Sequence, residues 1–165
     1  MKPKLSPPST SEEPRALPSD GDRRVADHFL TGWTLVAVFA TLGLVLEALH
    51  GFKVPWYVDA AATTRRLMWT LAHAHGLLLG LLNIAYGSTL ATLHTLRIPR
   101  APAVSLALRS AGVALPLGFF AAGVVPYAGD PGLPILLVPV AALLLLWAVI
   151  SLVLALRRAT RGPTR

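Results

Sequence analysis

The stretch RRLMWTLAHAHGLLLGLLNIAYGSTLATLHTLR, residues 65–97, decides the fold class of this 165-residue chain. Between its flanking arginines it stays apolar over more than the roughly 20 residues that cross a bilayer as a helix. It also carries three polar groups of functional character, His73, His75 and Asn83, on a frame rich in glycine. The stretch therefore predicts a membrane-spanning helix whose polar groups and glycines meet other helices.

The composition of the whole chain agrees with a membrane protein. Hydrophobic residues make up 54% and charged residues 14% of the sequence, and the mean hydropathy is +0.59, whereas a soluble domain averages about 25% charged residues. The net charge of +7 does not indicate nucleic-acid binding, because the basic residues flank the apolar runs, as in membrane proteins. The sequence has no cysteine, which excludes disulfides, thiolate metal sites and a cysteine nucleophile.

Four apolar runs have the length of a membrane span. They cover residues 29–50, 67–93, 104–125 and 135–156, and Pro116 inside the third run should kink that helix. The fold class predicted is all-α: an integral membrane four-helix bundle with up-down-up-down topology, formed by residues 25–158. Residues 1–24 are rich in proline, serine and mixed charge, which predicts a disordered N-terminal tail, and residues 159–165 form a basic C-terminal tail.

The distribution of basic residues predicts the orientation. Four spans put both termini on one side, where seven arginines lie near the membrane, and three basic residues lie near the other side: Arg23, Arg24, Arg97, Arg100, Arg157, Arg158 and Arg161 against Lys53, Arg65 and Arg66. The positive-inside rule then predicts cytoplasmic termini. Trp56 and Tyr57, in the connection after the first span, suit the aromatic belt at the opposite membrane surface.

Helical spacing sorts the spans into faces and predicts which of them pack. The second span places a G-x-x-x-G pair on the stripe of His73, and such a pair lets helix backbones approach closely. The predicted packing residues of the first two spans are Ala40, Gly43, Gly76, Gly80, Asn83 and Gly87. The fourth span offers no comparable small-residue face, so the first hairpin is predicted to form the core of the bundle.

Three polar residues are predicted to meet at the outer end of this hairpin. Glu47 and His50 lie near the end of the first span, and His73 lies about two turns inside the second. An ionisable group within a span is costly and needs a partner. For Glu47 the first candidate is His73, followed by Arg65 or Arg66 reaching back from the helix start.

Two interpretations of this cluster remain open. Imidazoles suit haem iron and transition metals, and a carboxylate can ligate a metal or orient a histidine. A haem or mononuclear metal site would use Glu47, His50 and His73, with His75 as a further candidate. A complete di-iron site is excluded, because the other spans carry no carboxylate. The alternative is a hydrogen-bonded polar network that locks the hairpin.

Three more polar groups within the spans have simpler predicted roles. His75 lies about 200° around the helix from His73, so it faces the third span, an oligomer partner or a second path. Asn83 is predicted to make a hydrogen bond between helices. Arg109 lies about 9 Å inside the third span and can reach toward the membrane surface.

A family resemblance adds one expectation. LEALHGFK, followed by RRLMWTLAHAHGLLLGLLNI, resembles uncharacterised bacterial four-span membrane proteins with an E-x-x-H-G…H-x-H-G pattern. The HAHG run is also similar to histidine-bearing helices of the haem–copper oxidase superfamily. The resemblance implies a bacterial inner membrane and a haem- or copper-related role for His73 or His75, without implying oxidase activity.

The sequence favours a protein without catalytic activity. It contains no Walker loop, H-E-x-x-H helix or dinucleotide fingerprint. The leading hypothesis is a polytopic membrane protein that serves as an accessory, assembly or interaction subunit, alone in the bilayer, as a homo-oligomer or with a complex partner. A haem- or metal-binding redox or sensor protein is the first alternative. A small transporter or proton pathway is the second.

Overall fold

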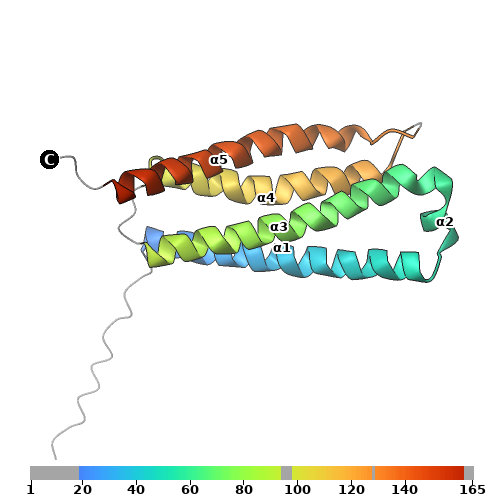
Figure 1. Cartoon of the computed structure of the whole chain (residues 1–165), viewed down its shortest axis with the longest axis horizontal. Coiled ribbons are helices and arrows are strands. Elements are labelled where there is room, and N and C mark those ends of the chain that lie inside the picture. The colour runs from blue at the N-terminus through green and yellow to red at the C-terminus, as the bar shows by residue number, and fades with distance from the viewer. Residues whose placement is uncertain (1–18, 94–97, 128, 162–165) are drawn as a thin grey trace, which may run out of the picture.

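The structure, a computed structural model, describes residues 19–93, 98–127 and 129–161. Four long helices dominate it: α1 (Asp20–Gly51), α3 (Thr63–Thr92), α4 (Ala101–Val124) and α5 (Leu137–Thr160). The connection between α1 and α3 contains the short helix α2 (Pro55–Val58) and the 3-10 turn η1 (Ala60–Ala62), and a second 3-10 turn, η2 (Leu133–Leu136), precedes α5. The long helices alternate in direction along the bundle (Figure 1), so the predicted up-down-up-down topology is confirmed.

All four long helices are long and apolar enough to cross a membrane. The protein is therefore a polytopic membrane protein built as a helical bundle, as the four apolar runs predicted. We call the end that holds the start of α1 and the end of α5 the inner end, and the end that holds α2 the outer end (Figure 1).

The first helix begins earlier than predicted. α1 starts at Asp20, so residues 20–24, assigned to a disordered tail, are helical, while the rest of that tail lies outside the described residues. The reason is a capping box. The Ser19 hydroxyl accepts from the Asp22 amide at 3.2 Å, and the Asp22 carboxylate accepts from the Ser19 amide at 3.1 Å, which satisfies two free donors of the first turn.

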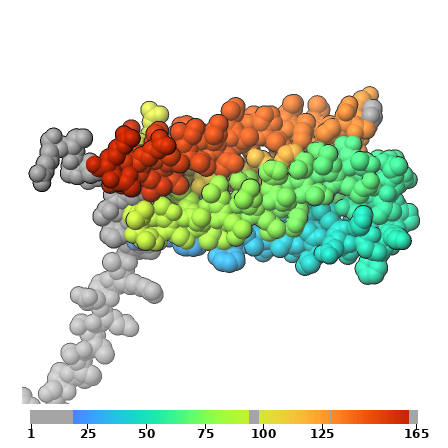
Figure 2. Space-filling view, in the orientation of Figure 1, coloured from blue at the N-terminus to red at the C-terminus, as the bar shows by residue number. Residues whose placement is uncertain are grey.

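The helices pack side by side in the order α1, α3, α4, α5. Each contacts the next, α1 touches α4 along a smaller part of its length, and the backbones of α1 and α5 do not approach one another. The two form opposite edges of the molecule (Figures 1 and 2). Their outward faces are the natural lipid-contacting surfaces, because they expose mainly large apolar side chains.

Glycines set the closest approach between α1 and α3. A Cβ atom added to Gly32 would lie 2.7 Å from the carbonyl oxygen of Gly80, and one added to Gly80 would lie 2.9 Å from that of Gly32. Gly76 receives the ring of Phe39, and Gly87 lies against His28. The glycine stripe predicted on the second span thus faces α1. On α1, Gly43 faces His73 of α3, and Ala40 is half-buried.

The fourth span also packs through small residues, contrary to the sequence-based interpretation. Its buried residues are Ala141, Ala148 and Ala155, spaced by seven. Ala148 and Ala155 join a core cluster with Tyr86 and Leu108. A seven-residue repeat keeps one side of a helix against its neighbour, so the core extends beyond the first hairpin to α4 and α5.

Candidate functional site

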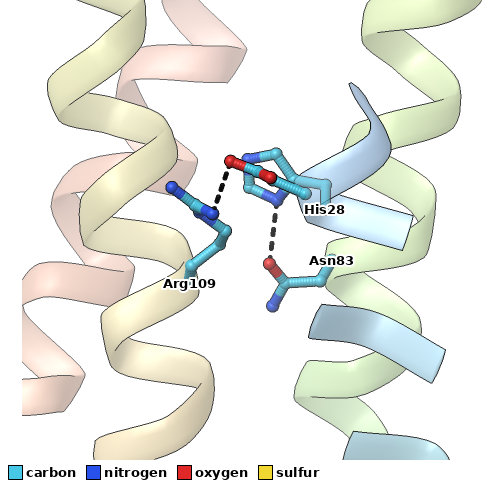
Figure 3. Close-up of polar contacts among 4 residues, drawn as sticks. His28, Asn83 and Arg109 are labelled. Atoms are coloured by element: carbon cyan, nitrogen blue, oxygen red, sulfur yellow. Dashed lines mark hydrogen bonds and ion pairs between the residues drawn. The ribbon is translucent and has the colours of Figure 1, made fainter. Parts of the chain in front are cut away.

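A cluster of polar side chains lies between α1, α3 and α4 toward the inner end of the bundle. We call it the inner polar cluster, and its members come from three helices: Asp27, His28, Asn83, Tyr86, Ser105 and Arg109. Figure 3 shows how Asn83 approaches His28 while Arg109 reaches from α4 toward α1. His28 and Asn83 are completely buried, and Tyr86 and Ser105 nearly so.

The centre of the cluster is a hydrogen bond between His28 and Asn83. The Nδ1 atom of His28 lies 2.9 Å from Oδ1 of Asn83. The Nδ2 group of Asn83 donates to the carbonyl oxygen of Leu79, one turn back in α3, at 2.9 Å. Gly112 makes room for this amide, since a Cβ there would lie 2.8 Å from Nδ2. Asn83 therefore makes the predicted bond between helices, with His28 as its partner.

Two hydroxyl groups complete the buried part of the cluster. The rings of His28 and Tyr86 meet edge to face with centroids 4.6 Å apart, and the Ser105 side chain lies beside the Tyr86 hydroxyl. Both hydroxyls, together with Nε2 of His28 and Nε of Arg109, are buried without a hydrogen-bond partner among the described residues. Four polar atoms with bonding capacity left over thus gather in one region, since a bond between the two neighbouring hydroxyls would still leave one hydroxyl hydrogen and free lone pairs.

An ion pair borders the cluster. Arg109 donates from an NH group to a carboxylate oxygen of Asp27 at 2.8 Å, and both side chains are part-exposed. Arg109 was predicted to be able to reach toward the membrane surface, and in the structure its guanidinium meets the carboxylate of Asp27 on α1. The pair links α1 directly to α4, which otherwise share a small contact.

His28 is the residue of this cluster that the sequence analysis missed. The first span was predicted to begin at residue 29, so His28 fell one residue outside it. A usable signal existed, because His28, Gly32, Leu35 and Phe39 recur at helical spacing and all four are buried on one face of α1. Asn83 also required a partner at the inner end of that face.

The outer cluster predicted from Glu47, His50 and His73 is absent. Within residues 19–93, 98–127 and 129–161, no three His, Asp or Glu side chains are grouped so that they could hold a metal ion. The His73 ring inserts against Gly43, and its Nδ1 atom lies 2.6 Å from the carbonyl oxygen of Phe39. Gly43 lies one turn before Glu47. Because the imidazole of His73 packs against Gly43, it lies one turn short of the Glu47 carboxylate.

Glu47 and His50 are instead exposed at the outer end. They line an open groove of about 730 Å³ with Tyr57, Thr63, Arg66 and Thr70. Glu47 bonds to neither of its candidate arginines in the part of the chain that is described. Arg66 donates to the carbonyl oxygens of Tyr57 and Asp59 at 2.8 and 2.6 Å, and Arg65 donates to that of Gly123 at 3.3 Å.

His75 faces the third span, one of the three positions left open for it. Its ring centroid lies 5.0 Å from that of Phe119 on α4. Its Nδ1 atom lies 2.8 Å from the carbonyl oxygen of Leu71 in its own helix. His73 and His75 therefore serve opposite neighbours, α1 and α4.

Aromatic rings and Arg65 fix the outer end of α4. Trp69 stacks on Phe120 with centroids 5.6 Å apart, and its indole N–H donates to the Phe120 carbonyl oxygen at 3.1 Å. The Arg65 guanidinium lies 5.8 and 5.9 Å from the Trp56 and Trp69 rings. A cation beside the C-terminal carbonyls of α4 also suits the helix dipole.

Tyr57, in α2 at the outer end, is buried, with 3% of its surface exposed. Of the two residues predicted for the aromatic belt, Trp56, which is 51% exposed, is therefore the one that suits it. Burial raises the pKa of the Tyr57 phenol above its ordinary value of 10.0, and Arg66 acts in the opposite direction. The folded protein thus favours the neutral phenol. This contribution to stability is complete below the unfolded pKa and is lost as the pH rises through the folded pKa.

We expect Tyr57→Phe to lose less of its free energy of unfolding than the unmodified protein between about pH 9 and pH 11, the range around an ordinary tyrosine pKa. Chemical unfolding in detergent at several pH values measures this difference. Tyr127→Phe is the matched control, because Tyr127 is 81% exposed in the outer loop. Equal alkaline losses in Tyr57→Phe and the unmodified protein would contradict the assignment.

Comparisons with known proteins add no relative: the chain matches no family model, no curated protein and no solved structure.

Proposed function

We propose that this polytopic membrane protein is a non-enzymatic accessory, assembly or interaction subunit. One observation carries the proposal: the buried and part-buried polar side chains His28, Asn83, His73, Asp27 and Arg109 join one helix to another. His73 reaches the Phe39 carbonyl across the α1–α3 contact, and Asn83 reaches His28 across the same contact. Asp27 and Arg109 join α1 to α4. This pattern is typical of a scaffold whose helices must hold one arrangement.

The interior of the bundle between its two ends favours the scaffold hypothesis over the hypothesis of a transporter or proton pathway. Outward from Asn83, the buried side chains of α1, α3 and α4 in the described part of the chain are apolar, including Leu35, Phe39, Ala72, Leu79 and Leu115. A route for a proton or polar solute would need water-accessible polar groups at this level. The two half-buried histidines at this level, His73 and His75, each have Nδ1 against a backbone carbonyl oxygen, that of Phe39 and that of Leu71.

Partners would bind at the two edge helices, which have one packed side each. In the most apolar 18-residue segment of each helix, 22% of the residues of α1 and 11% of those of α5 are buried within the bundle, against 50% for α4. On α1, the exposed residues Ala37 and Thr41 form a small-x-x-x-small pair that permits close approach of another helix. Thr41 donates to the Ala37 carbonyl oxygen at 2.8 Å, so its hydroxyl needs no outside partner.

The proposed setting is a bacterial inner membrane with cytoplasmic termini. Arg23, Arg24, Arg100, Arg157 and Arg158 lie at the inner end, which supports this orientation. The bacterial setting rests on the sequence resemblance.

Photo-crosslinking in native membranes tests the interaction role. A photoreactive residue at Ala37 of α1 or Ala142 of α5, both exposed, is expected to give a discrete protein–protein product from at least one edge. A photoreactive residue at buried Ala111 of α4 should give no such product. Lipid adducts alone from both edges would contradict an interaction subunit.

The same protein, purified in mild detergent, tests the cofactor hypothesis through its visible absorption spectrum and elemental analysis. A scaffold is expected to show neither a Soret band nor a stoichiometric metal. A bound haem or metal that disappears in His73→Ala would replace the scaffold proposal with redox or sensor chemistry at that histidine.

A further inference from the structure

The inner polar cluster contains bonding capacity that its role as a contact between helices does not use. Nε2 of His28, the hydroxyls of Tyr86 and Ser105, and Nε of Arg109 are all buried without a partner in the part of the chain that the structure describes. His28 and Tyr86 touch edge to face, and Ser105 and Arg109 lie one turn apart on α4. The four atoms therefore come from three helices that meet at one place.

The hydrogen bonds of Asn83 define which nitrogen of His28 carries a proton. The Leu79 carbonyl can accept but cannot donate, so the NH₂ group of Asn83 must face it. The amide oxygen of Asn83 then faces His28 and must accept from an Nδ1–H group. In the neutral imidazole this leaves Nε2 without a proton, as an acceptor.

The four groups without a hydrogen-bond partner within the described ranges therefore include both donors and acceptors. Nε2 of His28 accepts, the Nε–H group of Arg109 donates, and the two hydroxyls can do either. A small anion would be repelled by the lone pair of Nε2 and by the nearby Asp27 carboxylate. A metal cation would be repelled by the guanidinium of Arg109. A ligand that both donates and accepts satisfies every member, and water is the smallest such ligand, typically making about three hydrogen bonds when buried.

We propose that the inner polar cluster binds ordered water, which joins His28 to Tyr86, Ser105 and Arg109 and makes Nε2 of His28 a proton acceptor that is reachable from the inner end. A cavity of about 690 Å³ opens at that end, and its walls include Val25, Phe29, Leu90 and Ile98. Leu90 lies one turn beyond Tyr86 on α3. The cavity thus borders α3 about one helical turn, or 5.4 Å of helix rise, inward of Tyr86, and Phe29 in its wall is the neighbour of His28 in the chain.

Charged and titratable groups from three helices lie around His28. Asp27 and Arg24 lie on its own helix, Arg109 faces it from α4, and Tyr86 is the titratable group that faces it from α3. This site is independent of the interaction role, because it concerns the interior of the bundle and not its edges.

Nuclear magnetic resonance of ¹⁵N-histidine-labelled, full-length protein in bilayers tests the proposal directly. The His28 signals, assigned by their loss in His28→Gln, are expected to show a proton on Nδ1, a bare Nε2, and magnetisation transfer from water to the ring. A proton on Nε2, or a His28 ring without water contact, would overturn the proposal. Chloride-dependent shifts of these signals without water contact would indicate an anion site instead.

Two variants locate the water. Tyr86→Phe and Ser105→Ala each remove one hydroxyl, and each should reduce the water-to-His28 transfer several-fold without changing the Nδ1 tautomer. Ser88→Ala is the control, because the exposed Ser88 hydroxyl donates to the Ile84 carbonyl of its own helix at 2.9 Å. Unchanged transfer in both hydroxyl variants would overturn the proposed site even where water contacts His28. The measurement on the unmodified protein decides the proposal if a variant fails to fold.

Discussion

Replacing Gly32 with alanine is expected to destabilise the bundle by about 1–3 kcal/mol, the usual cost of overpacking a tight contact. The added Cβ would lie 2.7 Å from the Gly80 carbonyl oxygen and 2.6 Å from a side-chain carbon of Ile84. A side chain can rotate away, but a helix carbonyl cannot, so α1 and α3 must move apart. The substitution otherwise favours the helix, since alanine exceeds glycine in helix propensity by about 1 kcal/mol.

The sign of the effect therefore distinguishes packing from propensity. Thermal or denaturant unfolding in mild detergent, followed by circular dichroism, measures it. Gly51→Ala is the matched control, because a Cβ at Gly51 meets no atom within 4 Å. We expect the control to be neutral or slightly stabilising. A Gly32→Ala protein as stable as this control would show that α1 and α3 are not held at the distance described.

Two local sequence signals, the length of the apolar runs and the spacing of glycines, explain why so much of the fold could be predicted. A bilayer demands about 20 apolar residues for each span, so the four spans follow from composition alone. The close contact of α1 with α3 follows from glycines at helical spacing, which let two membrane helices approach closely. Both signals are local and strong, and the structure agrees with them at Gly76, Gly80 and Gly87.

The parts that could not be predicted depend on register between helices. Helical spacing places His73 and Glu47 on facing sides but cannot give the axial position at which two helices pair. The structure pairs His73 with Gly43, one turn short of Glu47, and this shift separates the predicted cluster. The same limitation hid His28, whose role depends on a partner 55 residues away.

The alanine repeat of α5 was overlooked for a different reason. Ala141, Ala148 and Ala155 are separated by the mainly large apolar segments ALLLLW and VISLVL, so the average over the helix looks uniformly apolar. The contact becomes visible when the residues are taken at intervals of seven. In a membrane, hydrophobicity does not distinguish the packed side of a helix from its lipid side, and side-chain size is the better guide.

Replacing Asn83 with leucine is expected to cost about 1–3 kcal/mol, because it leaves the Nδ1–H group of a completely buried histidine without an acceptor. Leucine is close to asparagine in length and adds no charge, so the loss reports mainly the hydrogen bond. Replacing both residues, His28→Leu with Asn83→Leu, removes donor and acceptor together. The double variant should therefore be less destabilised than the sum of the two single variants.

The difference between that sum and the double variant is the coupling free energy of the pair, which for membrane helices averages about 0.6 and reaches about 1.7 kcal/mol. We expect this pair near the upper end, because both side chains are completely buried and Asn83 is the hydrogen-bond partner of His28 among the described residues. Ser88→Ala on the same helix should change stability little, since its hydroxyl is exposed. Additive losses would mean that His28 and Asn83 are stabilised separately, and the contact between α1 and α3 would then rest on glycine packing and on the bond of His73 to the Phe39 carbonyl.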